Sequence, residues 1–321
     1  MKWPTYRTLA KRAESLGLNR LVRLVGSWRG LLVLTYHRIG DADQCEFDRG
    51  VYSTDEASFA EQMAFVRSHF EVVSIDDVVR RPAADWKKRQ AVLITFDDGY
   101  IDNYEIAFPI LKRLEIPALF FVTSGFIDQR SISWWDEIAW MVRKQYAGAS
   151  DEEVDDAIVE IVENYYEIPE AECEAYLNRV GDDAQTGRYS DASPVWMTWE
   201  MLREMAASGM SFGGHTVSHP ILTRTRSGNW EHELTEGRRR LEEELSVDVQ
   251  VFSYPVGNPD CFSADLKQQT ARHYRAAFSC YGGVNQGRGA GNWDRFDLRR
   301  WPVYGPMRQF HMTTTWPQLL N

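Results

Sequence analysis

The chain has 321 residues, of which 44% are hydrophobic and 26% charged, as expected for a globular protein of one large α/β domain or two smaller ones. The formal net charge of −11 argues against a nucleic-acid partner, which would require a basic surface. The longest apolar runs, such as Leu31–Leu34 and Ala118–Val122, have the length of a strand and are too short to span a membrane.

Residues 1–30 are interpreted as an N-terminal helical segment. They are rich in lysine and arginine, place leucines on one helical face, and lack the apolar core and cleavage site of a secretory signal. Such a helix either makes peripheral contact with a membrane surface or packs across the bottom of the domain. The missing signal and four scattered cysteines without a Cys-x-x-Cys pair favour a cytoplasmic location. The sequence indicates no particular oligomeric state.

Strands and helices alternate along the chain after residue 30. Apolar and β-branched runs predict strands at 31–36, 71–74, 92–96, 116–122, 211–213, 250–254, 275–279 and 297–303. Helical spacing of apolar residues predicts helices at 56–70, 75–79, 103–114, 199–208, 231–245 and 263–273. Seven or eight strand–helix units in one chain favour a closed α/β barrel of parallel strands, with function at the carboxyl ends of the strands.

One segment interrupts the alternation. Residues 131–194 contain no convincing strand and two or three helical patterns. We interpret this segment as a helical insertion in a strand-to-helix loop, forming a lid or a small subdomain.

Two acidic residues end the predicted strand at 92–96. Asp97 and Asp98 are adjacent, and two ionised carboxylates are costly where water is excluded unless a cation or a shared proton offsets them. A simple Asp-Gly turn at Asp98-Gly99 is the alternative interpretation.

A pair of histidines follows the predicted strand at 211–213. His215 and His219 are four residues apart, so one helical turn places both imidazoles within reach of a single ion. Alone, such a pair is as often structural as metal-binding. Together with an aspartate at a strand end, the pair forms a common ligand set for zinc or another divalent cation.

Three stretches resemble the motifs of the polysaccharide deacetylases, also known as the NodB-homology group or carbohydrate esterase family 4. They are, in chain order, Phe96-Asp97-Asp98-Gly99-Tyr100, His215-Thr216-Val217-Ser218-His219 and Tyr254-Pro255-Val256-Gly257. The resemblance runs from about residue 31 to residue 303 and implies a distorted (β/α)7-type barrel, so we assign residues 31–321 to this domain. The helical insertion at about 131–194 is not part of the minimal family domain. The resemblance also implies removal of N-acetyl groups from sugars such as N-acetylglucosamine, in a polysaccharide or its precursor.

The resemblance assigns roles to the motif residues. Asp98, His215 and His219 would hold a divalent metal, zinc first, with cobalt or nickel as alternatives. Asp97 would act as general base for a metal-activated water. The third motif, Tyr254 to Val256, would contact the substrate and supply a backbone N–H to the oxyanion.

Two departures from the family pattern leave roles open. Ser253 stands where the family's third motif usually has an arginine that orients the base, although an exopolysaccharide branch also has Phe-x-Tyr-Pro there. We hypothesise that Arg300 takes this role, with Arg299 as second choice; a solvent-facing arginine is the alternative.

The second departure concerns the general acid, because the usual Leu-x-His near the C-terminus has no clear match. His311 lies too far past the last strand to be assigned. His37, at the end of the first strand, is the candidate, and a structural histidine is the alternative.

The sequence therefore predicts a metal-dependent deacetylase of an N-acetylated carbohydrate. Two other functions remain open: a deformylase or deacetylase of a lipid-linked sugar, and a sugar-binding protein that keeps the metal but is catalytically impaired. Trp134 and Trp135, which begin the insertion, either stack on sugar rings or anchor the insertion in the core.

Overall fold

A computed structural model describes residues 28–317 except 83–84, 87–88, 193–194, 227–228 and 287–292. The N-terminal helical segment predicted for residues 1–30 therefore lies, up to residue 27, outside the described residues. None of the helices that the structure describes combines the length and the apolar character needed to cross a membrane.

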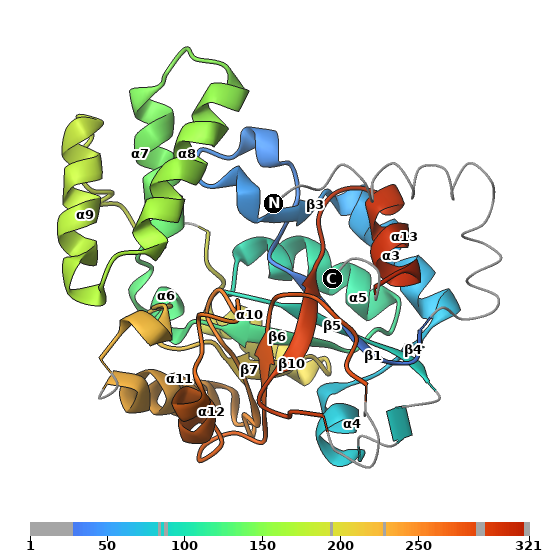
Figure 1. Ribbon diagram of the computed structural model, residues 1–321. Helices are drawn as coiled ribbons and strands as arrows, with labels where there is room; N and C mark the ends of the chain where they lie inside the picture. Colours follow the sequence, from blue (N-terminus) through green and yellow to red (C-terminus); the bar gives the residue numbers. More distant parts are fainter. Residues whose placement is uncertain are drawn as a thin grey trace.

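Seven parallel strands form a closed barrel in the described part of the chain (Figure 1), which confirms the predicted α/β barrel. The strands are β1 (Gly30–Tyr36), β5 (Gln90–Phe96), β6 (Ala118–Val122), β7 (Ser211–Gly214), β8 (Val251–Ser253), β9 (Ala276–Ser279) and β10 (Leu298–Pro302). Their order is β1-β10-β9-β8-β7-β6-β5, and β5 pairs back with β1 to close the barrel. A short strand, β4 (Glu71–Val72), extends the sheet beyond β5.

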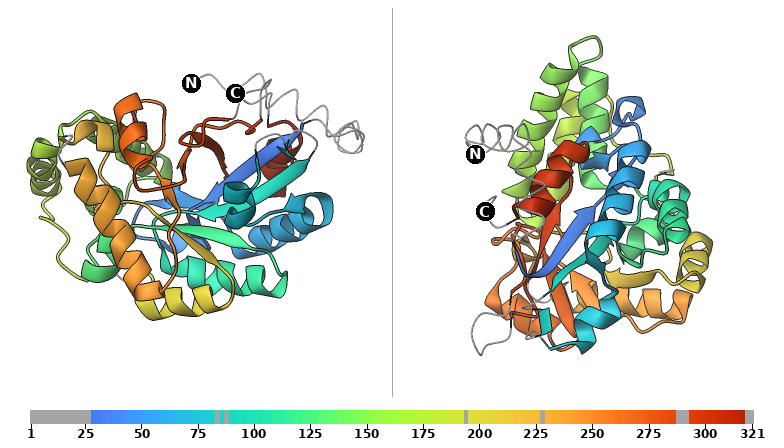
Figure 2. Two further views of the ribbon diagram at one scale, coloured as in Figure 1. Left: turned by 90° about the horizontal axis from the view of Figure 1, so that it is seen from below. Right: turned by 90° about the vertical axis from the view of Figure 1, so that its right-hand side faces the viewer.

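Helices between the strands cover the outside of the barrel (Figure 2). They are α3 (Glu56–His69), α4 (Ile75–Arg80), a π-helical turn at Asn103–Ala107 that continues into α5 (Phe108–Arg113), α6 (Ser124–Gln129), α10 (Trp199–Ala207), α11 (Trp230–Leu245) and α12 (Ala264–Thr270). The predicted helices agree with these except at their ends. The sequence patterns did not predict α6, the final helix α13 (Met307–Thr315), or the short paired strands β2 (Arg38–Ile39) and β3 (Tyr52–Thr54).

Three helices of residues 131–194 stand beside the barrel, at the upper left of Figure 1. They are α7 (Trp134–Gln145), α8 (Asp151–Tyr166) and α9 (Glu170–Asp183). Side chains from all three form a separate small apolar core that includes Ile138, Ile158 and Leu177. Trp134 stacks on Tyr165 with ring centroids 4.2 Å apart, so it joins the first helix of the insertion to the second.

Alternation along the strands gives the barrel two apolar layers. In β5, Leu93 faces the interior cluster, whereas Val92 and Ile94 belong to the cluster beneath the covering helices. A buried strand with both faces covered needs apolar residues at nearly every position, which explains the continuous run in its sequence. Towards the carboxyl ends the interior becomes polar: Thr35 and Thr95 share a hydrogen bond of 3.0 Å, and Asp97 follows Thr95 at the next inward position.

Candidate active site

A buried ion pair lies at the carboxyl end of the barrel. The Arg300 guanidinium, from β10, donates two parallel hydrogen bonds to Asp97, one of 2.7 Å to Oδ1 and one of 2.8 Å to Oδ2. Its other donors reach the carbonyl of Ser279 at 3.1 Å and Oγ of Ser253 at 2.7 Å. Asp97 is 3% exposed and Arg300 0%, so the structure brings these two predicted site residues together away from solvent.

The ion pair controls the charge of Asp97. Burial alone raises the pKa of Asp97, but Arg300, and then His215, outweigh that effect and leave the pKa below its ordinary value. Asp97 is therefore ionised at neutral pH inside the protein. Its Oδ2 atom lies 3.9 Å from Nε2 of both His37 and His215.

Asp98, His215 and His219, which we call the metal triad, converge beside this ion pair. Each side chain is almost completely buried, and each offers one ligand atom within 4.8 Å of the others. Oδ1 of Asp98 lies 3.4 Å from Nε2 of both histidines and has no hydrogen-bond partner among the described residues. A buried carboxylate oxygen without a partner, facing two imidazole nitrogens, fits a divalent cation with mixed oxygen and nitrogen ligands.

The charges within the metal triad also suit a cation. Burial raises the pKa of Asp98, but the imidazoles of His215 and His219 outweigh it and lower that pKa to about 2. Burial lowers the pKa of His219 to about 4, so this imidazole is neutral and can act as a ligand. For His215 burial acts in the same direction, but Asp97 and Asp98 outweigh it and raise the pKa, so a cation would compete there with a proton.

Backbone and carboxylate groups hold the two histidines in place. Nδ1 of His215 lies 2.8 Å from the carbonyl of Ser253, an outer contact typical of metal-binding imidazoles. Thr216 and His219 both have positive φ, at 68° and 56°, a conformation that the surrounding contacts must stabilise. The loop between the two histidines also donates hydrogen bonds to the carboxylate of Glu233.

Glu233 of α11 clamps the loop between the two histidines. Its carboxylate accepts hydrogen bonds from the N–H of Val217 at 2.7 Å, the N–H of Ser218 at 3.1 Å and Oγ of Ser218 at 2.8 Å. Glu233 is 9% exposed, so its charge is satisfied mainly by these three donors. The residue acts on the site through the loop that carries His219.

A cavity of about 430 Å³, the reaction cavity, opens above these groups. Barrel residues line its floor, including His37, the metal triad, Asp97, Val256 and Cys280. The insertion lines one wall through Trp134, Trp135, Ile158, Val159, Val162 and Tyr166, and Asp48 and Tyr304 complete the rim. Burial raises the pKa of the Cys280 thiol to about 11, so the thiol stays protonated and is a poor nucleophile at neutral pH.

Two further residues predicted for the site, His37 and Val256, line the reaction cavity, and each has a polar group available for a substrate. The main chain of His37 is fixed by Oγ of Ser53 and Nδ2 of Asn103, and its imidazole is partly exposed to the cavity. Val256 has φ of 63°, and among the described residues none accepts a hydrogen bond from its backbone N–H.

Three other candidates lie outside the cavity. Tyr254 is 0% exposed, stacks on Phe262, and uses its N–H and hydroxyl to bind the carbonyls of Phe278 and Phe296. The alternation that turns Ser253 inward turns Tyr254 outward, so the structure does not bring Tyr254 to the reacting groups. Arg299 is exposed and stacks on Tyr281, and His311 packs against Phe65 of α3.

Sequence analysis missed several residues that shape the site. Asp48 reaches the reaction cavity from the loop before β3, Tyr166 from the end of α8, and Tyr304 from the segment after β10. Burial, and then the charge of Asp136, raise the pKa of Asp48 to about 6. No local pattern marks these residues or Glu233, because each reaches the site through the tertiary fold.

Comparison with known proteins identifies the family. The family model described as polysaccharide deacetylase matches residues 85–275. The poly-beta-1,6-N-acetyl-D-glucosamine N-deacetylase of Escherichia coli (strain K12) is 28% identical over 116 residues, which cover 34% of this chain and 16% of that protein. The Staphylococcus aureus (strain N315) protein of the same name is 26% identical over 118 residues, 34% of this chain and 41% of that protein. The match therefore spans less than half the length of these relatives.

Solved structures share the fold. The Streptococcus pyogenes deacetylase PplD, determined in complex with acetate, superposes with a TM-score of 0.60 and 18% identity, covering 89% of this chain and 97% of that one. IcaB from Ammonifex degensii superposes with a TM-score of 0.54 and 21% identity, covering 91% and 98%. At these identities the similarity supports the barrel fold and no further detail.

Removing the Glu233 clamp should weaken metal binding without unfolding the barrel. We expect Glu233→Leu to raise the zinc dissociation constant by about tenfold or more, because mutation of groups that orient ligands has effects of that size. Competition with a chelating dye measures it. Glu233→Gln, which retains one acceptor oxygen, should recover most of the affinity. Glu243→Leu, on an exposed part of the same helix, is the control. Unchanged zinc affinity in Glu233→Leu would show that the clamp does not position the triad.

Proposed function

Because the chain belongs to the polysaccharide deacetylase family, we propose that it hydrolyses the N-acetyl group of an N-acetylated sugar in a polysaccharide or its precursor. The observation that carries the proposal is the buried Asp97–Arg300 pair, of which Asp97 lines one cavity together with the metal triad. The names of the relatives point to a polymer of N-acetylglucosamine as the first substrate to test.

The metal triad would hold one divalent cation. Zinc suits a set of one carboxylate and two imidazoles, and cobalt or nickel also accepts such ligands. When bound, the cation would polarise the acetamide carbonyl and lower the pKa of a neighbouring water. Three protein ligands leave coordination positions for substrate and water.

Asp97 acts as the general base. Arg300 keeps its carboxylate ionised and fixed in orientation, and Oδ2 faces the side of the site where His37 and His215 lie. The carboxylate removes a proton from the attacking water while the water oxygen forms its bond to the acetamide carbon. The free N–H of Val256 is available to stabilise the negative charge that develops on the carbonyl oxygen.

His37 donates a proton to the departing nitrogen. The carbon–nitrogen bond breaks as the nitrogen is protonated, which releases acetate and an amino sugar. The imidazole lies in the reaction cavity with Nε2 3.9 Å from Oδ2 of Asp97, so base and acid flank the same space. This arrangement supports a catalytic role for His37 over a purely structural one.

The lining of the reaction cavity argues against the two other candidate functions. Among the described residues that line it there is no lysine or arginine that would bind the phosphates of a diphosphate-linked lipid sugar. A protein that only bound sugar would need the metal ligands but would have no use for a buried, arginine-paired Asp97. Both features favour hydrolysis of an uncharged glycan.

Loss of the base should strongly reduce turnover while sparing the metal. We expect Asp97→Asn to reduce acetate release from poly-N-acetylglucosamine by about 10²- to 10⁴-fold, the usual contribution of general base catalysis. An enzymatic acetate assay measures the rate, and bound zinc should stay at the wild-type level. Asp43→Asn, at an exposed position, is the control. A wild-type rate of acetate release in Asp97→Asn would contradict the role of Asp97 as base. If the wild-type protein bound the sugar but released no acetate, the chain would be a sugar-binding protein.

Arg300, which orients Asp97, should determine the pH at which kcat/KM falls on the acid side of its pH profile. Asp97 must be ionised to act, and Arg300 lowers its pKa; a weaker partner therefore raises that pKa and moves the acid limb of kcat/KM to higher pH. We expect a shift in Arg300→Lys, which keeps the charge but loses the paired geometry, and a larger shift in Arg300→Ala. Arg299→Lys should match wild type. An unchanged acid limb in Arg300→Ala would exclude the orienting role.

A further inference from the structure

The two histidines of the metal triad are held in different ways. Nδ1 of His215 lies 2.8 Å from the carbonyl of Ser253, whereas the buried Nδ1 of His219 has no hydrogen-bond partner among the described residues. Glu233 fixes the backbone of the loop that carries His219 but does not bond to its ring. The orientation of the His219 imidazole therefore depends on the groups that pack against it.

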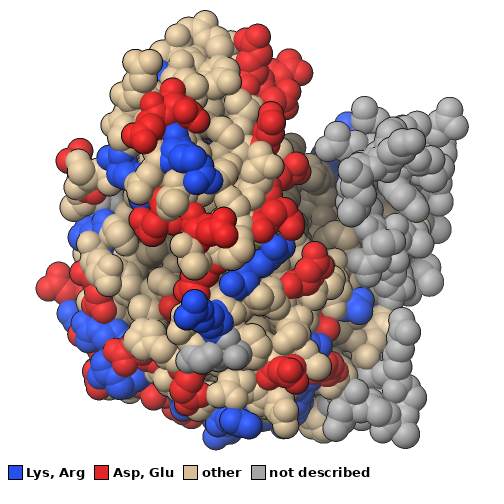
Figure 3. Space-filling model, turned by 60° about the vertical axis from the view of Figure 1, so that its left-hand side comes forward, with Lys and Arg blue, Asp and Glu red and all other residues tan. Residues whose placement is uncertain are grey.

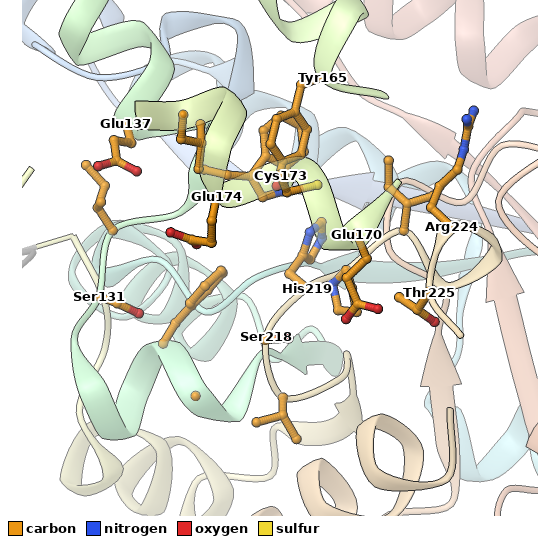
Figure 4. Close-up of a pocket in the computed structure, with 18 of the residues that line it drawn as sticks. Ser131, Glu137, Tyr165, Glu170, Cys173, Glu174, Ser218, His219, Arg224 and Thr225 are labelled. Atoms are coloured by element: carbon orange, nitrogen blue, oxygen red, sulfur yellow. The ribbon is translucent and has the colours of Figure 1, made fainter. Parts of the chain in front are cut away.

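Open space lies next to the His219 side chain in two directions. His219 lines the reaction cavity and also a second cavity of about 470 Å³ between the helical insertion and the barrel. Figure 4 shows its imidazole among the side chains that line this second cavity. A side chain between two cavities can change its torsion angles unless neighbouring groups restrain it.

Aromatic rings from two helices pack against the His219 imidazole. Trp135 of α7 meets it edge to face, with ring centroids 4.6 Å apart and an interplanar angle of 63°. Phe126 of α6 is more distant, at 6.4 Å. Edge-to-face contacts between aromatic rings are favourable and depend on orientation. The closer of these two contacts thus comes from the helical insertion.

A chain of buried hydrogen bonds fixes Trp135. Its Nε1 donates to the hydroxyl of Tyr100 at 2.7 Å, and that hydroxyl donates to Oδ2 of Asp136 at 3.0 Å. Asp136 is 0% exposed and also accepts hydrogen bonds from Oγ of Ser133 at 2.7 Å and from the N–H of Asp48 at 3.1 Å. The Asp136 carboxylate therefore joins the start of the insertion to the loop that follows β5.

The outer surface of the insertion, in contrast, is charged. In Figure 3 acidic side chains gather on the upper part of the face shown, and the blue side chains there lie next to red ones. Asp151, at the start of α8, forms an ion pair of 2.9 Å with Arg49 at the surface. Exposed ion pairs contribute little to stability, so the buried bonds of Asp136 contribute more to the attachment of the insertion.

We propose that the helical insertion positions the metal ligand His219: Asp136 and Tyr100 hold Trp135, and Trp135 orients the imidazole. The inference rests on the metal triad of the proposed function. The insertion is then part of the metal site as well as a wall of the reaction cavity. Because coupling between two sites is reciprocal, a metal ion bound at the triad should in turn hold the insertion against the barrel.

Metal affinity tests the role of Trp135. We expect Trp135→Leu to raise the dissociation constant of cobalt about tenfold or more, because loss of groups that orient ligands has effects of that size. Competition with a chelating dye measures it. The visible absorption of bound cobalt, which depends on ligand geometry, should change as well. Trp135→Phe keeps an aromatic ring beside His219 and should recover part of the affinity.

A second tryptophan of the same helix provides the control. Trp140 packs against Tyr189 and lines neither cavity. Trp140→Leu should therefore bind cobalt with wild-type affinity and absorption. Wild-type affinity and absorption in Trp135→Leu would overturn the positioning role.

The hydrogen-bond chain is tested through Tyr100. Tyr100→Phe removes the hydroxyl that joins Trp135 to Asp136 and should raise the cobalt dissociation constant severalfold. Tyr104→Phe, which loses a hydroxyl bonded to Glu204 at the surface, is the control. Tyr100→Phe combined with Trp135→Leu should bind cobalt no more weakly than Trp135→Leu alone, because both changes act through the same contact. Fully additive effects would overturn the chain.

Amide hydrogen exchange tests the reciprocal effect. Zinc should slow exchange in α7 of the wild type more than in α4, whose residues line neither of the two cavities. Trp135→Leu should lose this additional protection of α7. Equal protection of both helices in the wild type, or additional protection that persists in Trp135→Leu, would overturn the coupling.

These measurements separate the positioning role from the proposed function. If the wild type binds cobalt and releases acetate, but Trp135→Leu and Tyr100→Phe bind cobalt equally well, the positioning role is overturned and the proposed function stands. If the variants lose affinity as expected but the wild type releases no acetate, the proposed function fails and the positioning role stands. A wild type that binds no divalent ion would overturn the metal triad and the positioning role together.

Discussion

Burial of two adjacent carboxylates at the mouth of the barrel is the constraint on which the site depends. Asp97 and Asp98 are 3% and 2% exposed, and removing an unpaired carboxylate from water costs several kcal/mol. The fold offsets the two charges differently. Arg300 gives Asp97 two parallel hydrogen bonds, whereas Oδ1 of Asp98 faces the imidazoles of His215 and His219. One carboxylate is thereby held as a fixed anion, and the other has the surroundings of a metal ligand.

The alternation of side chains between the two faces of each strand explains which site residues could be predicted from the sequence. In β5 the inward positions run through Leu93 and Thr95 to Asp97, so a buried strand followed by two aspartates already places one carboxylate inside the barrel. Arg300 follows the buried Leu298 at the same period. In β8 the same alternation places Ser253 inside the barrel and turns the next residue, Tyr254, outside. The prediction that Tyr254 contacts the substrate came from the family motif and did not take this alternation into account.

Other parts of the site could not be derived from local patterns. Asp48, Tyr166 and Tyr304 meet at one cavity although they come from a loop, an insertion helix and the segment after the last strand. Only the tertiary arrangement brings such distant residues together. Short elements such as α6 and β2 were missed for a related reason, since few residues carry too little periodicity to detect. The barrel supplies rigid positions for the reacting groups, and the insertion supplies the walls that surround them.

Metal content tests the proposed metal triad most directly, because the measurement requires no knowledge of the substrate. The protein is dialysed against zinc, cobalt or nickel, freed of excess ion, and analysed by mass spectrometry together with His215→Ala and Asp98→Asn. We expect about one divalent ion per wild-type chain and loss of that ion in both variants. A wild-type protein that retains none of the three ions, or variants that retain the full amount, would contradict the proposed metal site.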